Sequence, residues 1–173
     1  MTSIKNSALI WSWLSLLVLV IDLATKQMAE AWLHYGNPVY LLPVLDFTLL
    51  YNKGAAFSLL ADQPGWQRWF FTFISAAVSV MLMVWMRRLP RSQPWLAVSL
   101  ALILGGAVGN LVDRVLFGHV IDFISVHWDN AYFPAFNIAD SAITAGAIMM
   151  AIDVIRDSIS TQKPASDSVS RSD

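Results

Sequence analysis

Long stretches of mainly apolar residues, with few charges, dominate the chain. Each is close to the roughly 20 residues that a helix needs to cross the hydrocarbon core of a bilayer. They cover residues 8–24, 69–86, 95–112 and 138–155. The first is uncharged until Asp22 and continues with helical character to about Trp32, and no clean small-x-small cleavage site follows it. We therefore interpret it as a retained span rather than a signal peptide, and the pattern predicts four transmembrane helices.

A different pattern connects the first two spans. Residues 39–51 are rich in β-branched and aromatic residues that partly alternate with others, and Pro38 and Pro43 interrupt them. Asn52-Lys-Gly54 then supplies turn chemistry. We expect an all-α membrane protein of four transmembrane helices, with a small β-rich segment and a loop or short helix on the outer, periplasmic face. Residues 1–157 are expected to form one domain, and the polar residues 158–173 a disordered cytoplasmic tail.

Composition and charge agree with a membrane protein and set its orientation. The chain is 57% hydrophobic and 13% charged, whereas soluble domains carry about 25% charged residues. Most basic residues lie near the termini and in residues 87–94, which places both termini in the cytoplasm. The tryptophans lie near span ends or in connecting segments, as an interfacial belt requires. A net charge of -1 gives no sign of a nucleic-acid partner, and the absence of cysteine excludes thiolate chemistry and disulfides.

Polar residues that are distant in sequence are predicted to meet at one membrane depth, near the outer interface. Asp22 lies at the outer end of the first span, Asp113 and Arg114 end the third, and Asp140 opens the fourth, while Asp122 lies in an outer loop. Ionisable groups at membrane depth are costly, so their clustering on one side favours a functional site. The Gly105-x-x-x-Gly109 spacing would let helices pack closely nearby.

Each of these positions also has a structural interpretation. Asn137 could cap a helix while Asp140 favours its positive end. Asp122 and Lys53 could be solvated loop charges, and two pairs, Asp113 with Arg114 and Asp22 with Lys26, could be structural ion pairs. Other chemistries are disfavoured because the histidines lack H-E-x-x-H spacing and no G-x-S-x-G, P-loop or dinucleotide motif is present. Carboxylates remain the candidates for acid–base work, with no metal and no cofactor.

Five sequence blocks, in this order, resemble the lipoprotein signal peptidase (signal peptidase II) family from the first span to the end of the fourth. They are Asp22-Leu-Ala-Thr-Lys26, Tyr51-Asn-Lys-Gly-Ala-Ala-Phe57, Gly105-Gly-Ala-Val-Gly-Asn-Leu-Val-Asp-Arg114, Val120-Ile-Asp-Phe123 and Phe133-Pro-Ala-Phe-Asn-Ile-Ala-Asp140. The resemblance implies an aspartic endopeptidase of the bacterial inner membrane. Such an enzyme removes the signal peptide from diacylglyceryl-modified prolipoproteins just before the lipidated cysteine.

By position, the resemblance assigns Asp122 and Asp140 to the catalytic pair, and Asp22 with Lys26 to structural support. It assigns the site lining to Asn52, Gly54, Asn110, Asp113, Arg114 and Asn137. Two close carboxylates share a proton, and a helix N-terminus at Asn137 would favour the charge on Asp140. The implied partners are prolipoproteins, membrane lipid and cyclic-peptide inhibitors of the globomycin type, with the protein acting as a monomer. Two non-enzymatic alternatives are a transporter or channel subunit, which would need polar groups strung through the membrane, and an assembly factor.

Overall fold

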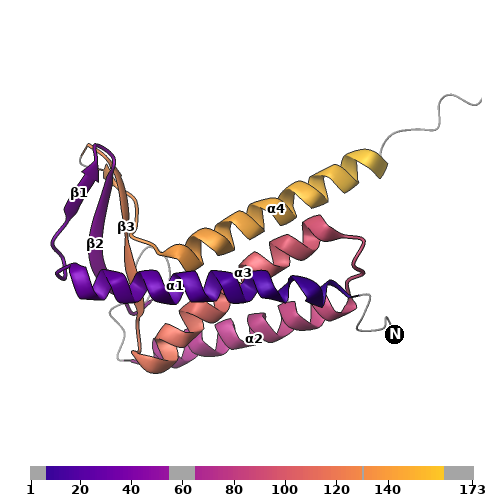
Figure 1. Ribbon diagram of the computed structural model, residues 1–173, viewed down its shortest axis with the longest axis horizontal. Coiled ribbons are helices and arrows are strands. Elements are labelled where there is room, and N and C mark those ends of the chain that lie inside the picture. Colours follow the sequence, from indigo (N-terminus) through magenta and orange to yellow (C-terminus); the bar gives the residue numbers. More distant parts are fainter. Residues whose placement is uncertain (1–6, 55–64, 130, 162–173) are drawn as a thin grey trace, which may run out of the picture.

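The structure, a computed structural model, describes residues 7–54, 65–129 and 131–161. A short 3-10 helix, η2 (Ala8–Trp11), leads into the first α-helix. The elements that follow are α1 (Ser12–Trp32), β1 (Val39–Leu42), β2 (Leu45–Asn52), α2 (Trp66–Arg88), α3 (Pro94–Leu116), β3 (Val120–Trp128), β4 (Ala131–Tyr132) and α4 (Ile138–Thr161). The helices run alongside one another, and the sheet lies across one end of the bundle with its strands steeply inclined to the helix axes (Figure 1).

Four helical stretches are long and apolar enough to cross a membrane, which confirms the predicted spans and makes the chain a multi-pass membrane protein. They cover Ala8–Trp32, Trp66–Arg88, Pro94–Leu116 and Ile138–Ile159. Each is longer than the stretch predicted from the sequence. Asp22 therefore lies well inside α1 rather than at its outer end. The last helix, α4, continues to Thr161, into the segment expected to be a disordered tail, and residues 162–173 lie outside the described residues.

Glycines on α3 bring the neighbouring helices into close contact. A Cβ atom added at Gly105 would lie 2.8 Å from the Val18 Cβ on α1, and one added at Gly109 would lie 2.5 Å from the Asp22 carboxylate. Gly106 faces the backbone of Ala139 on α4 in the same way. The expected close packing at the glycine motif is confirmed, and α3 is the most buried of the spans. It is the helix against which α1 and α4 are positioned.

The four strands form one antiparallel sheet in the order β1-β2-β3-β4. Leu49, Ile121 and Phe123 of the sheet pack with Ala29 of α1 in a small apolar cluster. The Phe136 carbonyl accepts hydrogen bonds from the backbone N–H groups of Phe123 and Ile124. This contact ties the start of α4 to the middle of β3, next to Asp122.

The expectation that Asp122 lies in an outer loop or short helix is wrong, because it lies on β3. Val120–Trp128 is rich in β-branched and aromatic residues, and it pairs with β2 along most of its length. Gly118, at φ +80°, makes the turn that lets the chain pass from α3 into this strand.

Both ends of the described chain lie at the end of the bundle opposite the sheet (Figure 1). There the N–H of Ala8 donates to the carbonyl of Leu89 in the α2–α3 connection, and Ser7 bridges to Pro90. The larger apolar core cluster, with Leu82, Met86 and Leu100, fills this half of the molecule. The carboxylates of interest are thereby separated from the termini by the length of the spans.

Candidate active site

Asn137, fully buried at the start of α4, links the Asp122 carboxylate to the backbone of Asp140. Its Oδ1 accepts a hydrogen bond from the backbone N–H of Asp140 at 2.9 Å, which is the N-terminal cap expected from its position. Its Nδ2 donates to Asp122 Oδ1 at 2.8 Å. Because the cap contact fixes the oxygen, the amide nitrogen must face Asp122. The capping interpretation is therefore confirmed, and the same side chain also holds Asp122.

A second amide donates to Asp122, and a separate amide donates to Asp140. Asn52 Nδ2 donates to Asp122 Oδ2 at 3.1 Å, and Asn110 Nδ2 donates to Asp140 Oδ1 at 2.7 Å. Asp122 is only 2% exposed, whereas Asp140 is partly exposed. The expectation that Asp122 is a solvated loop charge is therefore wrong, because this carboxylate is buried.

Burial and the neighbouring charge change the acidity of Asp122. Burial disfavours its charged form, and the negative charge of Asp140 acts in the same direction, so that the pKa of Asp122 is raised to about 7. Hydrogen bonds from Asn52 and Asn137 oppose this shift. A carboxylic acid that keeps its proton near neutral pH beside a second carboxylate is the arrangement needed for paired acid and base roles.

Behind this pair lies a buried ionic cluster. Lys26 Nζ lies 2.7 Å from Asp22 Oδ2 and 2.8 Å from Asp113 Oδ2, and all three side chains are at most 1% exposed. The expected pair of Asp22 with Lys26 is confirmed, but the pair of Asp113 with Arg114 is wrong. Asp22 Oδ1 also accepts from the N–H of Ala139, and Asp113 Oδ2 from that of Ile121. These contacts fix the first turn of α4 and the start of β3 to the helices.

Arg114 and Gly54 form the remaining wall. Arg114 donates to the Gly54 carbonyl at 3.1 Å, and its guanidinium lies over the Phe71 ring. The Gly54 N–H donates to Asn52 Oδ1 at 3.0 Å. This is the expected turn at Asn52-Lys-Gly54, and it directs the Asn52 nitrogen toward Asp122. Lys53 is exposed at the cavity edge.

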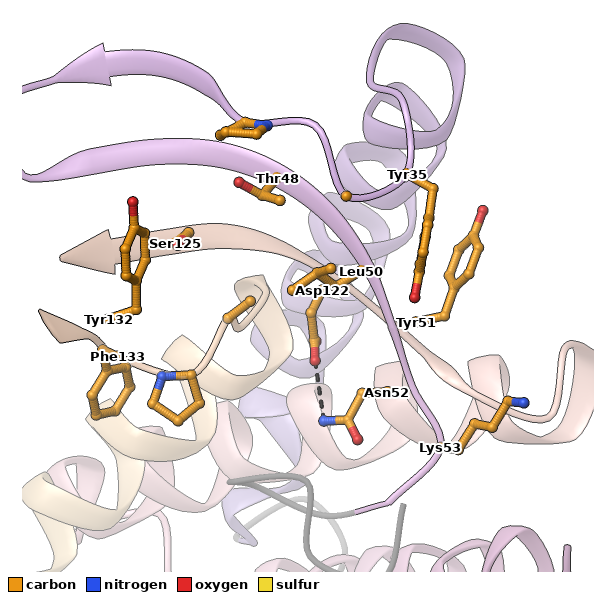
Figure 2. A pocket seen from close by; sticks show the side chains of 14 residues that line it. Tyr35, Thr48, Leu50, Tyr51, Asn52, Lys53, Asp122, Ser125, Tyr132 and Phe133 are labelled. Atoms are coloured by element: carbon orange, nitrogen blue, oxygen red, sulfur yellow. Dashed lines mark hydrogen bonds between the residues drawn. The ribbon is translucent and has the colours of Figure 1, made fainter. Parts of the chain in front are cut away.

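Two cavities meet at the carboxylates. The larger, about 920 Å³, reaches Asp122 and Asn52 between Tyr35 and Tyr51 on one side and Tyr132 and Phe133 on the other (Figure 2). The smaller, about 370 Å³, includes Asp140. It shares with the larger cavity the residues Asn52, Phe133, Pro134 and Ala135. Asp122 therefore lines one cavity and Asp140 the other, and the two cavities adjoin at these shared residues.

The site brings together every residue that the sequence placed in it, and it adds others. Arg68, which the sequence did not single out, donates to the carbonyls of Arg114 and Val115 at the end of α3. The aromatic residues at the mouth of the larger cavity were also missed. No sequence motif indicates Arg68 or these aromatic residues, because their positions depend on how loops and helix ends pack together.

A comparison with models of protein families shows to which family the chain is related. The profile described as signal peptidase (SPase) II matches residues 14–156. The chain belongs to the signal peptidase II family.

Relatives of known name agree with this membership. A lipoprotein signal peptidase from Pseudomonas fluorescens strain Pf0-1 is 60% identical over 148 residues, which cover 84% of this chain and 87% of that protein. One from Pseudomonas putida strain KT2440 is 58% identical over 150 residues, covering 86% and 88%. A solved structure titled a bacterial membrane enzyme is 29% identical with a TM-score of 0.78, and the match covers 90% of this chain and 93% of that one.

Membership in the signal peptidase II family, a family of peptidases, decides against the transporter and assembly-factor alternatives. The ionic cluster agrees, because Lys26 pairs with Asp22 and Asp113 on the side of the bundle that carries the sheet. They do not form a polar path that continues toward the termini.

Proposed function

We propose that this chain is an aspartic endopeptidase that removes the signal peptide from diacylglyceryl-modified prolipoproteins, cleaving just before the lipidated cysteine. Family membership and the names of the relatives support the substrate class. The observation that carries the chemistry is that Asn137 joins the Asp122 carboxyl group on β3 to the backbone of Asp140 on α4, so that the Asp140 charge acts on Asp122. The two carboxyl groups take different amide donors, and the pKa of Asp122 is raised to about 7.

In the proposed mechanism Asp140 is the base and Asp122 the acid. The ionised Asp140 takes a proton from water, whose oxygen attacks the scissile carbonyl carbon, while Asp122 donates its proton to the carbonyl oxygen. Collapse of the tetrahedral intermediate breaks the C–N bond. Asp140 then gives its proton to the leaving amine, and the hydroxyl proton returns to Asp122. The cap of α4 and the Asn110 amide both favour negative charge on Asp140, which supports this division of roles.

The two cavities suit an extended substrate whose lipid remains in the membrane. An unwound segment has free backbone polar groups that need partners, and Asn52 lines both cavities while Arg114 lines the smaller one. The smaller cavity also has an apolar wall that includes Phe136 and Ile143, which suits the lipid-bearing residue. The edge strand β1 offers a further site for strand addition.

The proposed location is the bacterial inner membrane, with both termini cytoplasmic and the site near the periplasmic face. The termini share one end of the bundle (Figure 1), where Arg87, Arg88 and Arg156 are exposed. Because the chain lacks cysteine, single cysteines at Lys53 and at Arg91 would report topology without background. In intact cells with a permeable outer membrane, an impermeant maleimide should label the first and not the second, and the reverse pattern would contradict the orientation.

Cleavage of a diacylglyceryl-modified prolipoprotein by purified protein tests the activity, with Asp122→Asn and Asp140→Asn alongside. Both changes keep the side-chain shape and remove the carboxylic acid. Asp46→Asn is the matched control, because Asp46 is equally buried on β2 but lies outside the pair. The expected result is loss of cleavage in the first two variants alone. Normal cleavage by either one, with its fold intact, would contradict the aspartic mechanism.

The proposal also includes action as a monomer and inhibition by cyclic peptides of the globomycin type. Such a peptide should compete with the prolipoprotein for the two cavities, raising KM without changing kcat. Light scattering in detergent, corrected for bound detergent, should give the mass of one chain.

A further inference from the structure

Lys26 makes a complete set of hydrogen bonds inside the membrane-spanning part of α1. Its ammonium contacts Asp22 Oδ2 at 2.7 Å, Asp113 Oδ2 at 2.8 Å and Asn110 Oδ1 at 3.2 Å. An ammonium has three N–H donors and no acceptor. Each of its three donors therefore has an acceptor. The first two contacts neutralise charge, whereas the third goes to an uncharged amide that needs no neutralisation.

That third contact determines which way the Asn110 amide points. Because a donor-only group faces it, the atom of Asn110 on the Lys26 side must be oxygen. Asn137 Nδ2 donates to the same oxygen at 3.3 Å. The Asn110 nitrogen is thereby turned toward Asp140, to whose Oδ1 it donates at 2.7 Å. A rotation of this amide by half a turn would instead point its carbonyl at the Asp140 carboxylate.

We propose that Lys26 is a positioning residue for the reaction, acting through the Asn110 amide to present an N–H donor to Asp140. This inference rests on the proposed roles of Asp122 and Asp140. An N–H donor favours the charged form of Asp140, so that the shared proton resides on Asp122. A carbonyl in the same place would favour a protonated Asp140 and would remove the base from the pair. Lys26 itself does not touch the reacting atoms.

A purely structural role for Lys26 is the competing explanation, since its carboxylate partners also anchor the backbone at Ala139 and Ile121. Two variants of Lys26 separate the explanations. Lys26→Met and Lys26→Gln both remove the positive charge and leave Asp22 and Asp113 without it. Only Lys26→Gln retains an N–H that can donate to the Asn110 oxygen. Their difference therefore measures the donor and not the charge.

The measurement is kcat, KM and the pH profile for a diacylglyceryl-modified peptide, with every variant in the same micelles. Lys26→Met should have a kcat about tenfold below that of Lys26→Gln, which is about 1.4 kcal/mol on the barrier, with KM unchanged. Its pH profile should also differ from that of Lys26→Gln, because the Asn110 N–H no longer faces Asp140. Ser15→Ala is the control: it removes another buried α1–α3 hydrogen bond, from Ser15 Oγ to the Ala101 carbonyl, and should leave the profile unmoved.

Lys26→Met and Lys26→Gln are then each combined with Asn110→Ala. In this background the two Lys26 variants should have equal kcat. Equal kcat and equal pH profiles in the presence of Asn110 would overturn the inference, as would a Met-to-Gln difference that persists without Asn110. If loss of charge prevents folding, Asp22→Asn is added to both variants. It relieves one unpaired carboxylate and keeps an oxygen for the Ala139 N–H. Active Asp122→Asn or Asp140→Asn protein would instead refute the proposed function itself.

Discussion

Replacing Asn52 with alanine tests which carboxyl group holds the shared proton. The Asn52 oxygen is occupied by the Gly54 N–H at 3.0 Å, so that only its nitrogen can face Asp122, at 3.1 Å. An N–H donor stabilises the ionised carboxylate and not the protonated acid. Its removal should therefore raise the pKa of Asp122 above the value of about 7 that burial and the charge of Asp140 give it.

The size of the shift follows from the contact. A hydrogen bond to a charged group contributes about 1.5–3 kcal/mol. We take the lower end, about 1.4 kcal/mol or one pH unit, because Asn52 is partly exposed and water can replace it. Above its pKa Asp122 lacks the proton that the mechanism requires, so that kcat/KM of the wild type should fall above about pH 7. In Asn52→Ala the fall should begin about one unit higher, although the maximum kcat/KM is lower.

The assay is kcat/KM against pH from about 5 to 9, which reports ionisations of the free enzyme. Ser79→Ala is the control, since it removes a hydrogen bond inside α2, to the Ser75 carbonyl. The basic limb of its kcat/KM profile should coincide with that of the wild type. A basic limb that stayed in place or moved to lower pH in Asn52→Ala would refute the assignment of the acid to Asp122. Unchanged kinetics at every pH would remove Asn52 from the site.

Three further predictions concern stability as well as activity. Asn137→Ser should retain the cap of α4 and be more stable than Asn137→Ala, by about 1 kcal/mol of unfolding free energy in denaturant titrations. Both variants should nevertheless lose most cleavage, because both remove the amide N–H that donates to the Asp122 oxygen. Gly109→Ala should lower the melting temperature and activity together, since its Cβ would lie 2.5 Å from the Asp22 carboxylate, and overpacking of this kind costs about 1–3 kcal/mol. His127→Ala should destabilise by about 1–3 kcal/mol, because it leaves the buried Asp46 carboxylate without the His127 ring 3.3 Å away. Asp46→Asn should cost less, and equal melting temperatures for these last two variants would contradict that reasoning.

The spans and the polar cluster could be predicted because hydrocarbon imposes a length and a charge rule on each helix separately. The pairing inside the cluster could not be predicted with the same certainty, because it depends on helix rotation. Asp113 and Arg114 are adjacent in sequence, and neighbours on a helix do not face each other. Asp113 points to Lys26 and Arg114 to Gly54. Helix geometry therefore disfavours an ion pair between Asp113 and Arg114, in agreement with the structure.

The strand that carries Asp122 could also be predicted from the sequence. Val120–Trp128 has the composition of a strand and lies between the Gly118 turn and Asp129, which has a positive φ. Its place between two spans nevertheless led to the expectation that Asp122 lies in an outer loop. By contrast, no local pattern predicts that the Phe136 carbonyl would join β3, since this contact depends on the tertiary meeting of two segments.

The meeting of these segments explains how a site with two carboxylates can be stable at a membrane surface. Asp122 and Asp140 come from different elements, and like charges would push those elements apart. Opposing this, Asn137 binds both elements through one amide, and the Lys26 cluster fixes the backbone of each a single residue away, at Ile121 and Ala139. The repulsion therefore acts against anchored backbone, and it is relieved by retention of a proton on Asp122 rather than by separation. The anchored backbone keeps Asp122 buried near the charge of Asp140, and these two effects, rather than the hydrogen bond from Asn137, keep the acid protonated.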